Sequence, residues 1–204
     1  MKKFRMMLTL LMVGLCSWQS AWAQGVEVTV ESIAEAGELG IEILKKHDPI
    51  TEITSLTVQS GTLNDADWTT LRSLTSLTTL DLRGVSNESM PNNQFNKNNS
   101  GCDADNLVTV WLPLNLKTIG ESAFSGQSSL VNVYIPSTLE SLGQYAFNNC
   151  SALTSIGLDA LPSSVTSIPE YCFYRCNNLG PFDIPEGVLS ILSVLYLSQH
   201  YPPH

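Results

Sequence analysis

The sequence predicts an α/β solenoid, in which short coils of chain stack and each coil adds one strand to a parallel β-sheet. Three observations predict this fold: a repeat of 23 to 30 residues, a six-residue apolar pattern within it, and a phenylalanine at a constant place after that pattern. Repeats of roughly 20–50 residues are typical of stacked-repeat proteins, because a single unit cannot bury its apolar face alone. We therefore expect one repeat domain in this 204-residue chain.

The six-residue pattern is Leu or Ile, two variable residues, and then two apolar residues separated by one. Its alternation is typical of a half-buried strand, and the proline that follows several copies would end that strand. Successive copies begin 24, 30, 23, 23 and 26 residues apart. The copies are residues 53–58, 77–82, 107–112, 130–135, 153–158 and 179–184.

A second pattern keeps the same register. It is an apolar residue, then Gly or Pro, and a phenylalanine five positions after the apolar residue. This phenylalanine has no apolar partner within its own repeat, so only stacking on the next coil can bury it. We therefore expect one buried column of rings, made of Phe95, Phe124, Phe147 and Phe173.

Residues 1–23 have the features of a signal peptide: a basic start, a short apolar stretch, and Ala21 and Ala23 before the cleavage point. Leu15 stands before Cys16, where a lipoprotein signal needs a small residue. The leader holds none of the 19 Asp and Glu residues, so the exported chain is strongly acidic. We therefore expect no nucleic-acid partner and no attraction to an anionic membrane. No later stretch is apolar for long enough to cross a bilayer.

The repeats are expected to span residues 53–191, with a cap before them and a tail after them. Residues 24–52 begin with alternating valines and become helix-like toward Leu44, as an N-terminal cap over the first coil would. Residues 192–204 are an irregular tail that makes a poor polar cap. We expect either a shortened array or end-to-end self-association of two copies at this end.

Two segments carry a family resemblance. IPSTLESLGQYAFNNCSAL (135–153) and LPSSVTSIPEYCFYRCNNL (161–179) resemble the BspA-type leucine-rich repeat of surface proteins from oral and gut anaerobes. The resemblance extends over roughly residues 50 to 191. It implies a right-handed leucine-rich-repeat solenoid with a helical N-terminal cap, secreted or displayed on a bacterial cell surface. It also implies a non-enzymatic recognition or adhesion module that contacts extracellular or host matrix proteins. A structural spacer, or a fragment of a larger surface protein, is an alternative.

Trp111 and Tyr134 are predicted to lie side by side on neighbouring strands and to face solvent. Asp81 belongs to the same outward column, and Thr109 and Asn132 belong to the adjacent one. Exposed aromatic residues at the centre of a patch are typical anchors for binding. Alternatively, the two rings brace the sheet, as cross-strand aromatic pairs do. We predict a ligand-binding site made of these five residues, for a protein or, alternatively, for a carbohydrate.

Cys150 and Cys176 share one repeat position, which Gln127 occupies in an earlier repeat. As free thiols they would fill a tight corner of the coil. In an exported protein they could instead form a disulfide between neighbouring coils. A metal pair of Cys172 and Cys176 has neither nearby His ligands nor the spacing of a zinc site.

Catalytic motifs are missing from the sequence. It contains no GxSxG, HExxH or phosphate-binding glycine loop. The Asp pairs at 65 and 67 and at 103 and 105 lack the glutamate of a calcium loop, and Asp67 can instead cap a helix that starts at Trp68. We therefore expect no enzymatic activity, no metal and no cofactor.

Overall fold

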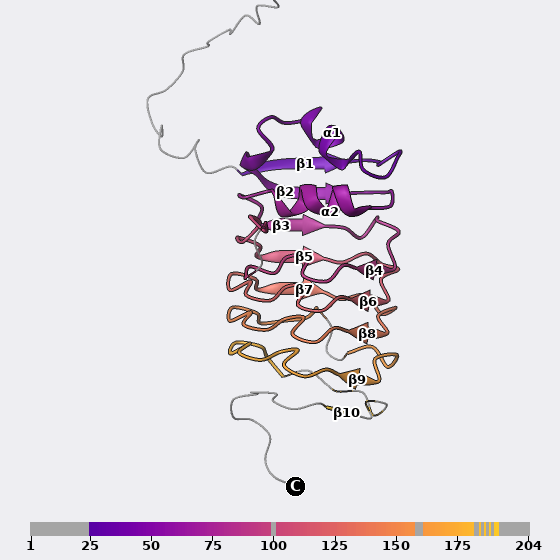
Figure 1. Ribbon diagram of the computed structural model, residues 1–204, viewed down its shortest axis with the longest axis vertical. Coiled ribbons are helices and arrows are strands. Elements are labelled where there is room, and N and C mark those ends of the chain that lie inside the picture. The colour runs from indigo at the N-terminus through magenta and orange to yellow at the C-terminus, as the bar shows by residue number, and fades with distance from the viewer. Residues whose placement is uncertain are drawn as a thin grey trace, which may run out of the picture.

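The computed structural model describes residues 25–98, 101–157 and 161–181, followed by residues 184, 186, 188, 190 and 191. In these residues the chain forms a stack of coils, with the N-terminal helices at one end and β9 toward the other (Figure 1). The predicted leader at 1–23 and the predicted tail at 192–204 lie outside the described residues, so the self-association expected at the tail does too. Residues 182 and 183 of the repeat copy at 179–184 also lie outside them.

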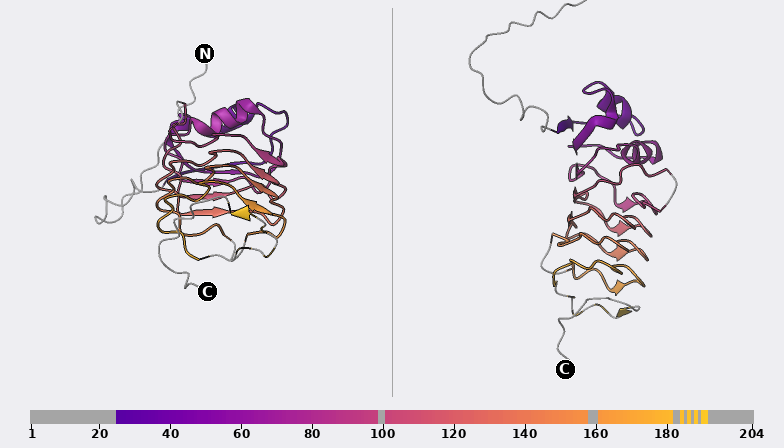
Figure 2. Two further views of the ribbon diagram at one scale, coloured as in Figure 1. Left: turned by 60° about the horizontal axis from the view of Figure 1, so that its bottom comes forward. Right: turned by 90° about the vertical axis from the view of Figure 1, so that its left-hand side faces the viewer.

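One parallel sheet of five strands runs along the stack, in the order β1-β2-β3-β5-β7. Every neighbouring pair in it is parallel, and the second view in Figure 2 shows the coils edge-on, one beneath another. The predicted parallel sheet is therefore present. Its strands are β1 (Val26–Val30), β2 (Ile53–Val58), β3 (Thr79–Asp81), β5 (Thr109–Trp111) and β7 (Asn132–Tyr134).

Two details of this sheet differ from the sequence prediction. The segment predicted as a cap supplies β1, which pairs along its whole length with β2 and so begins the sheet. The copy at 153–158 contributes only an isolated bridge between Asn132 and Ser155. Gly157 adopts a left-handed conformation with φ 73°, which departs from the extended backbone of a strand.

A second parallel sheet, which the sequence did not predict, lies on another side of the coils. Its short strands follow one another in the order β4-β6-β8. Each pairs through one buried apolar residue and one polar neighbour. Gly120 and Gly143 follow two of these strands, where a Cβ atom would lie 2.6 Å and 2.4 Å from the backbone of the preceding coil. These glycines let successive coils approach closely. The strands are β4 (Ser89–Met90), β6 (Thr118–Ile119) and β8 (Ser141–Leu142), with β9 (Ser167–Ile168) paired separately to β10 (Ser190–Ile191).

The predicted column of phenylalanines is confirmed. Phe95, Phe124, Phe147 and Phe173 are buried, and the centroids of successive rings lie 5.6, 5.3 and 5.5 Å apart. The rings therefore continue from coil to coil at nearly the spacing of the strands, about 4.8 Å. The core of each coil is completed only by its neighbours, as expected for a repeat protein.

Two helices and a short 3-10 turn lie near the N-terminus: α1 (Leu39–Leu44), η1 (Ile50–Glu52) and α2 (Asp65–Arg72). Helix α2 begins three residues before the predicted start at Trp68, because Asn64 rather than Asp67 is its N-cap. The buried Asp67 carboxylate accepts hydrogen bonds from the backbone N–H groups of Gly37 and Leu39 at 2.7 and 2.9 Å. Asp67 therefore ties the start of α1 to the start of α2.

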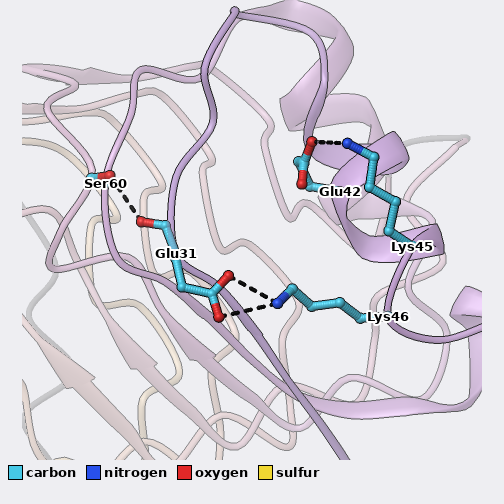
Figure 3. A network of polar contacts seen from close by, with 5 residues as sticks. All are labelled: Glu31, Glu42, Lys45, Lys46 and Ser60. Atoms are coloured by element: carbon cyan, nitrogen blue, oxygen red, sulfur yellow. Dashed lines mark hydrogen bonds and ion pairs between the residues drawn. The ribbon is translucent and has the colours of Figure 1, made fainter.

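One ion pair connects the end of α1 to the segment after β1, and a hydrogen bond connects that segment to the one after β2 (Figure 3). Lys46 contacts the carboxylate of Glu31 at 2.8 Å, and Lys45 contacts Glu42 within the helical segment. The hydroxyl of Ser60 donates to the backbone carbonyl of Glu31 at 2.9 Å. Among the described residues, no helix combines the length and apolar character required to span a membrane.

Candidate functional site

The register of the sheet brings all five predicted site residues to one face. Asp81 pairs with Trp111, and Trp111 pairs with Tyr134, so these three lie in one column across β3, β5 and β7. Thr109 pairs with Asn132 in the neighbouring column. Side chains two residues apart on a strand point to the same side of the sheet. The two columns therefore form one continuous polar and aromatic surface.

The rings of Trp111 and Tyr134 are stacked, with centroids 5.0 Å apart and planes within 2°. Trp111 is half-buried and Tyr134 is 38% exposed. This contact shows that the bracing interpretation holds, because each ring packs on the other across neighbouring strands.

Arg83, which the sequence analysis missed, belongs to the same surface. Its guanidinium carbon lies 5.5 Å from the centroid of the Trp111 ring, a distance typical of a cation–π contact. Because β3 and β7 flank β5 on opposite sides, Arg83 and Tyr134 cover opposite faces of the indole. Arg83 follows Asp81 by two residues, so the alternation of a strand is the signal that could have found it.

Asp81 holds the Arg83 side chain in place. Its carboxylate oxygens accept hydrogen bonds from Nε of Arg83 at 3.0 and 3.1 Å and from Nη2 at 2.6 Å. Partial burial opposes ionisation of Asp81, but the hydrogen bonds and charge of Arg83 outweigh it and lower the pKa of the carboxyl group. The same hydrogen bonds raise the pKa of Arg83. This ion pair is therefore charged at neutral pH and orients the cation over Trp111.

Gly157 makes room for Tyr134 on the following coil. A Cβ atom at this position would lie 2.6 Å from Cδ1 of Tyr134 and 2.9 Å from its Cα. The absence of a side chain therefore lets the phenol ring lie against the backbone of the next coil. Arg83, Trp111, Tyr134 and Gly157 form one continuous stack, in which neighbouring groups lie over the ring faces.

Comparison with known families identifies the repeats that build this surface. Residues 98–198 match the family described as BspA type leucine rich repeat region, in six copies. The chain carries a BspA-type leucine-rich repeat region. The resemblance found in the sequence is thereby confirmed, and both Trp111 and Tyr134 lie within the matched residues.

Three solved structures are similar to this chain. A leucine rich repeat protein of T. pallidum is 22% identical over 76% of this chain and 60% of its own, with a TM-score of 0.48. A leucine rich cell surface protein of Faecalibacterium prausnitzii is 26% identical over 51% of this chain and 32% of its own, with a TM-score of 0.40. A leucine-rich repeat protein of Bacteroides ovatus is 20% identical over 79% of this chain and 43% of its own, with a TM-score of 0.48. The chain thus spans less than two thirds of each. Comparison with curated proteins found no match.

Within the BspA-type repeat region, Cys150 and Cys176 carry free thiols in the structure. The Cys150 thiol donates to the carbonyl of Phe124 at 3.1 Å, and the Cys176 thiol donates to that of Phe147 at 3.0 Å. Gln127, at the same repeat position, donates to the carbonyl of Phe95 at 2.8 Å. All three side chains therefore hold the phenylalanine segment of the preceding coil.

Cys150, Cys172 and Cys176 of the BspA-type repeats are buried in the core. Burial raises the pKa of the Cys150 thiol, and the neighbouring Cys176 raises it further. Burial likewise raises the pKa of Cys172. These thiols are therefore protonated at neutral pH, when they are weak nucleophiles. In the part of the chain that the structure describes, no three His, Cys, Asp or Glu side chains gather closely enough to bind a metal ion.

Proposed function

We propose that this chain is an exported, non-enzymatic recognition module of a bacterial surface, which binds extracellular proteins through the outer face of β2, β3, β5 and β7. In this proposal the BspA-type repeats form a right-handed solenoid, and the N-terminal helices cap it. The observation that carries the proposal is the stack of Arg83, Trp111 and Tyr134 on an otherwise small, polar sheet face.

The composition of this stack favours a protein ligand. Trp, Tyr and Arg are the residue types that most often dominate the energy of protein interfaces. Here they are already ordered, because Asp81 holds Arg83 and the two rings hold each other. Binding therefore immobilises few additional side chains, which lowers the entropic cost of association.

The geometry of the rings favours a protein ligand over a sugar. A sugar ring that stacks on an aromatic side chain needs an open ring face. Arg83 and Tyr134 cover the two faces of Trp111, and Trp111 and Gly157 cover those of Tyr134. The exposed edges and the Tyr134 hydroxyl remain suited to side chains and backbone groups of a protein.

The test is binding of the purified protein to immobilised, enzymatically deglycosylated extracellular-matrix proteins. We expect binding by the native protein, and about a tenfold or greater loss in Trp111→Ala and Tyr134→Ala, as for interface anchors. Tyr145→Ala is the matched control. It removes a partly exposed aromatic residue that follows β8 and lies outside the five-stranded sheet. Thermal unfolding of each variant separates lost binding from lost folding.

Three results would contradict the proposal. Absence of binding to any matrix protein would favour a structural spacer. Retained binding in both aromatic variants would place the interface elsewhere. Binding to isolated glycans that disappears in Trp111→Ala would favour the carbohydrate alternative at this surface.

A further inference from the structure

A second aromatic stack lies in the turn segments that follow β8 and β9. Tyr145 and Tyr171 occupy the same repeat position, and their rings lie 5.1 Å apart with planes within 6°. Ser122 occupies this position in the preceding coil. The backbone φ angles at these three residues are 53°, 57° and 56°, so the chain presents all three side chains in the same way.

Other aromatic contacts are confined to the Tyr171 end of this stack. The rings of Tyr171 and Tyr174 meet in a T-shaped arrangement, and the guanidinium of Arg175 lies over the Tyr174 ring. Toward the N-terminus, the neighbour of Tyr145 is the small side chain of Ser122. Within the described part of the chain, Tyr171 is the only ring that contacts Tyr145.

Equivalent backbone hydrogen bonds join the coil of Ser122 to that of Tyr145, and the coil of Tyr145 to that of Tyr171. We call the space beside Ser122, next to the ring of Tyr145, the open level. The N–H of Ser122 donates to the carbonyl of Gln144 at 2.9 Å, and the N–H of Tyr145 donates to the carbonyl of Glu170 at 3.3 Å. The step from Ser122 to Tyr145 is thus made in the same register as the step from Tyr145 to Tyr171. A flat ring at the level of Ser122 would therefore continue the stack on the free face of Tyr145.

The backbone at these positions indicates that the tyrosines do more than pack. A left-handed conformation is unfavourable for a residue with a side chain, and Asn tolerates it better than Tyr. Asn93 and Ser122 occupy the position in earlier coils with similar φ angles, so the coil does not require an aromatic residue there. Unfavourable backbone conformations that persist often mark functional sites.

Polar side chains border the open level. Glu121, Gln144 and Glu170 occupy the repeat position directly before Ser122 and the two tyrosines. Glu121 is exposed and has no ion-pair partner among the described residues, while Gln144 donates to Glu170 at 3.2 Å. Carboxylates accept hydrogen bonds from hydroxyl groups and repel other anions.

We propose that the free face of Tyr145, above Ser122 and beside Glu121, binds a neutral hexopyranose ring. The apolar C–H face of the sugar stacks on the phenol ring, as apolar groups do on aromatic faces. The sugar hydroxyls donate to Glu121 and exchange hydrogen bonds with the Ser122 hydroxyl. The carboxylates beside the stack select against sugars that carry an acid group. This site is separate from the protein-binding surface proposed above.

The test is saturation-transfer NMR of the purified protein with the methyl glycosides of glucose, galactose and mannose. We expect transfer to the C–H protons of at least one glycoside, and binding about five to ten times weaker in Tyr145→Ala, the loss expected for one stacking contact. Ser122→Tyr fills the open level with a third ring, in a backbone that already holds tyrosine at 145 and 171. We expect it to abolish transfer without lowering the thermal midpoint. Leu114→Ala, which removes an exposed apolar side chain outside both stacks, is the control and should bind like the native protein.

Several outcomes would overturn the proposal. They are no transfer to any of the three glycosides, unchanged transfer in Ser122→Tyr, or equal transfer to the methyl glycoside of glucuronic acid. Saturation transfer to N-acetyltyrosine amide, with none to any glycoside, would assign the open level to an aromatic side chain instead. Because Ser122→Tyr keeps the native Tyr145 stack, the test remains decisive even if Tyr145→Ala does not fold.

Discussion

The indole of Trp111 and the phenol ring of Tyr134 lie parallel within 2°, although 23 residues of chain separate them. Their pairing is set by the parallel register of β5 and β7. A double-mutant cycle with Trp111→Ala and Tyr134→Ala should give a coupling energy of about 0.5–1.5 kcal/mol, as for other stacked pairs. Urea unfolding followed by circular dichroism measures it. Strictly additive effects would show that the stack contributes nothing to folding.

Gly157→Ala should destabilise the protein by displacing the Tyr134 ring. The new Cβ atom would lie 2.6 Å from the ring and 2.9 Å from the Cα of Tyr134, at a φ of 73°. Gly101→Ala is the matched control, since Gly101 also has a positive φ, of 98°, but has nothing within 4 Å of its added Cβ. We expect Gly157→Ala to cost about 1–3 kcal/mol more than the control, as overpacking does. Equal unfolding free energies would refute this role of Gly157.

Asp67→Ala should loosen the N-terminal helices. The buried carboxylate accepts backbone hydrogen bonds from Gly37, Leu39 and Asn64 at 2.7, 2.9 and 3.0 Å. Hydrogen bonds to a charged group contribute about 1.5–3 kcal/mol, and the loss leaves buried N–H groups unpaired. Amide hydrogen exchange should accelerate at Gly37 and Leu39. Asp65→Ala, on the exposed side of the same helical turn, should leave both amides protected.

The ion pair between Asp81 and Arg83 predicts an acid-dependent loss of stability. Its sign follows from the lowered pKa of Asp81 in the folded protein. A carboxyl group with a lowered folded pKa stabilises the fold above its unfolded pKa, and this contribution disappears as the pH falls through the folded pKa. Arg83→Gln should therefore destabilise the protein at neutral pH and have little effect once Asp81 is protonated. NMR titration should show the pKa of Asp81 rising in Arg83→Gln and unchanged in Lys117→Gln.

The thiol state of the repeats can be measured directly. With free and buried cysteines, the folded protein should react slowly with a thiol reagent, and the half-buried Cys102 should react before Cys150, Cys172 and Cys176. Unfolding in denaturant without reductant should expose all four as free thiols. Recovery of only two would mean that the disulfide allowed by the sequence forms in solution.

Side-chain spacing along the chain predicted the solenoid and most of its candidate surface. The regular interval between Phe124, Phe147 and Phe173 was sufficient to predict a buried column, because equivalent residues of stacked coils must meet. Alternation within each six-residue strand placed Trp111 and Tyr134 side by side for the same reason. Arg83 was missed although it lies on the same face as Asp81, since only the residues between apolar positions were considered.

The sequence by itself determined the repeat, the direction of each strand side chain and the acidic, polar character of the surface, because these depend on order along the chain. Only the tertiary structure decided which ring faces are covered, that β1 joins the sheet, and that Asp67 links two helices. Those outcomes depend on neighbours from other coils and on backbone angles. Arg83 and Gly157 therefore close the faces of one aromatic stack, while Ser122 leaves a face of the other open.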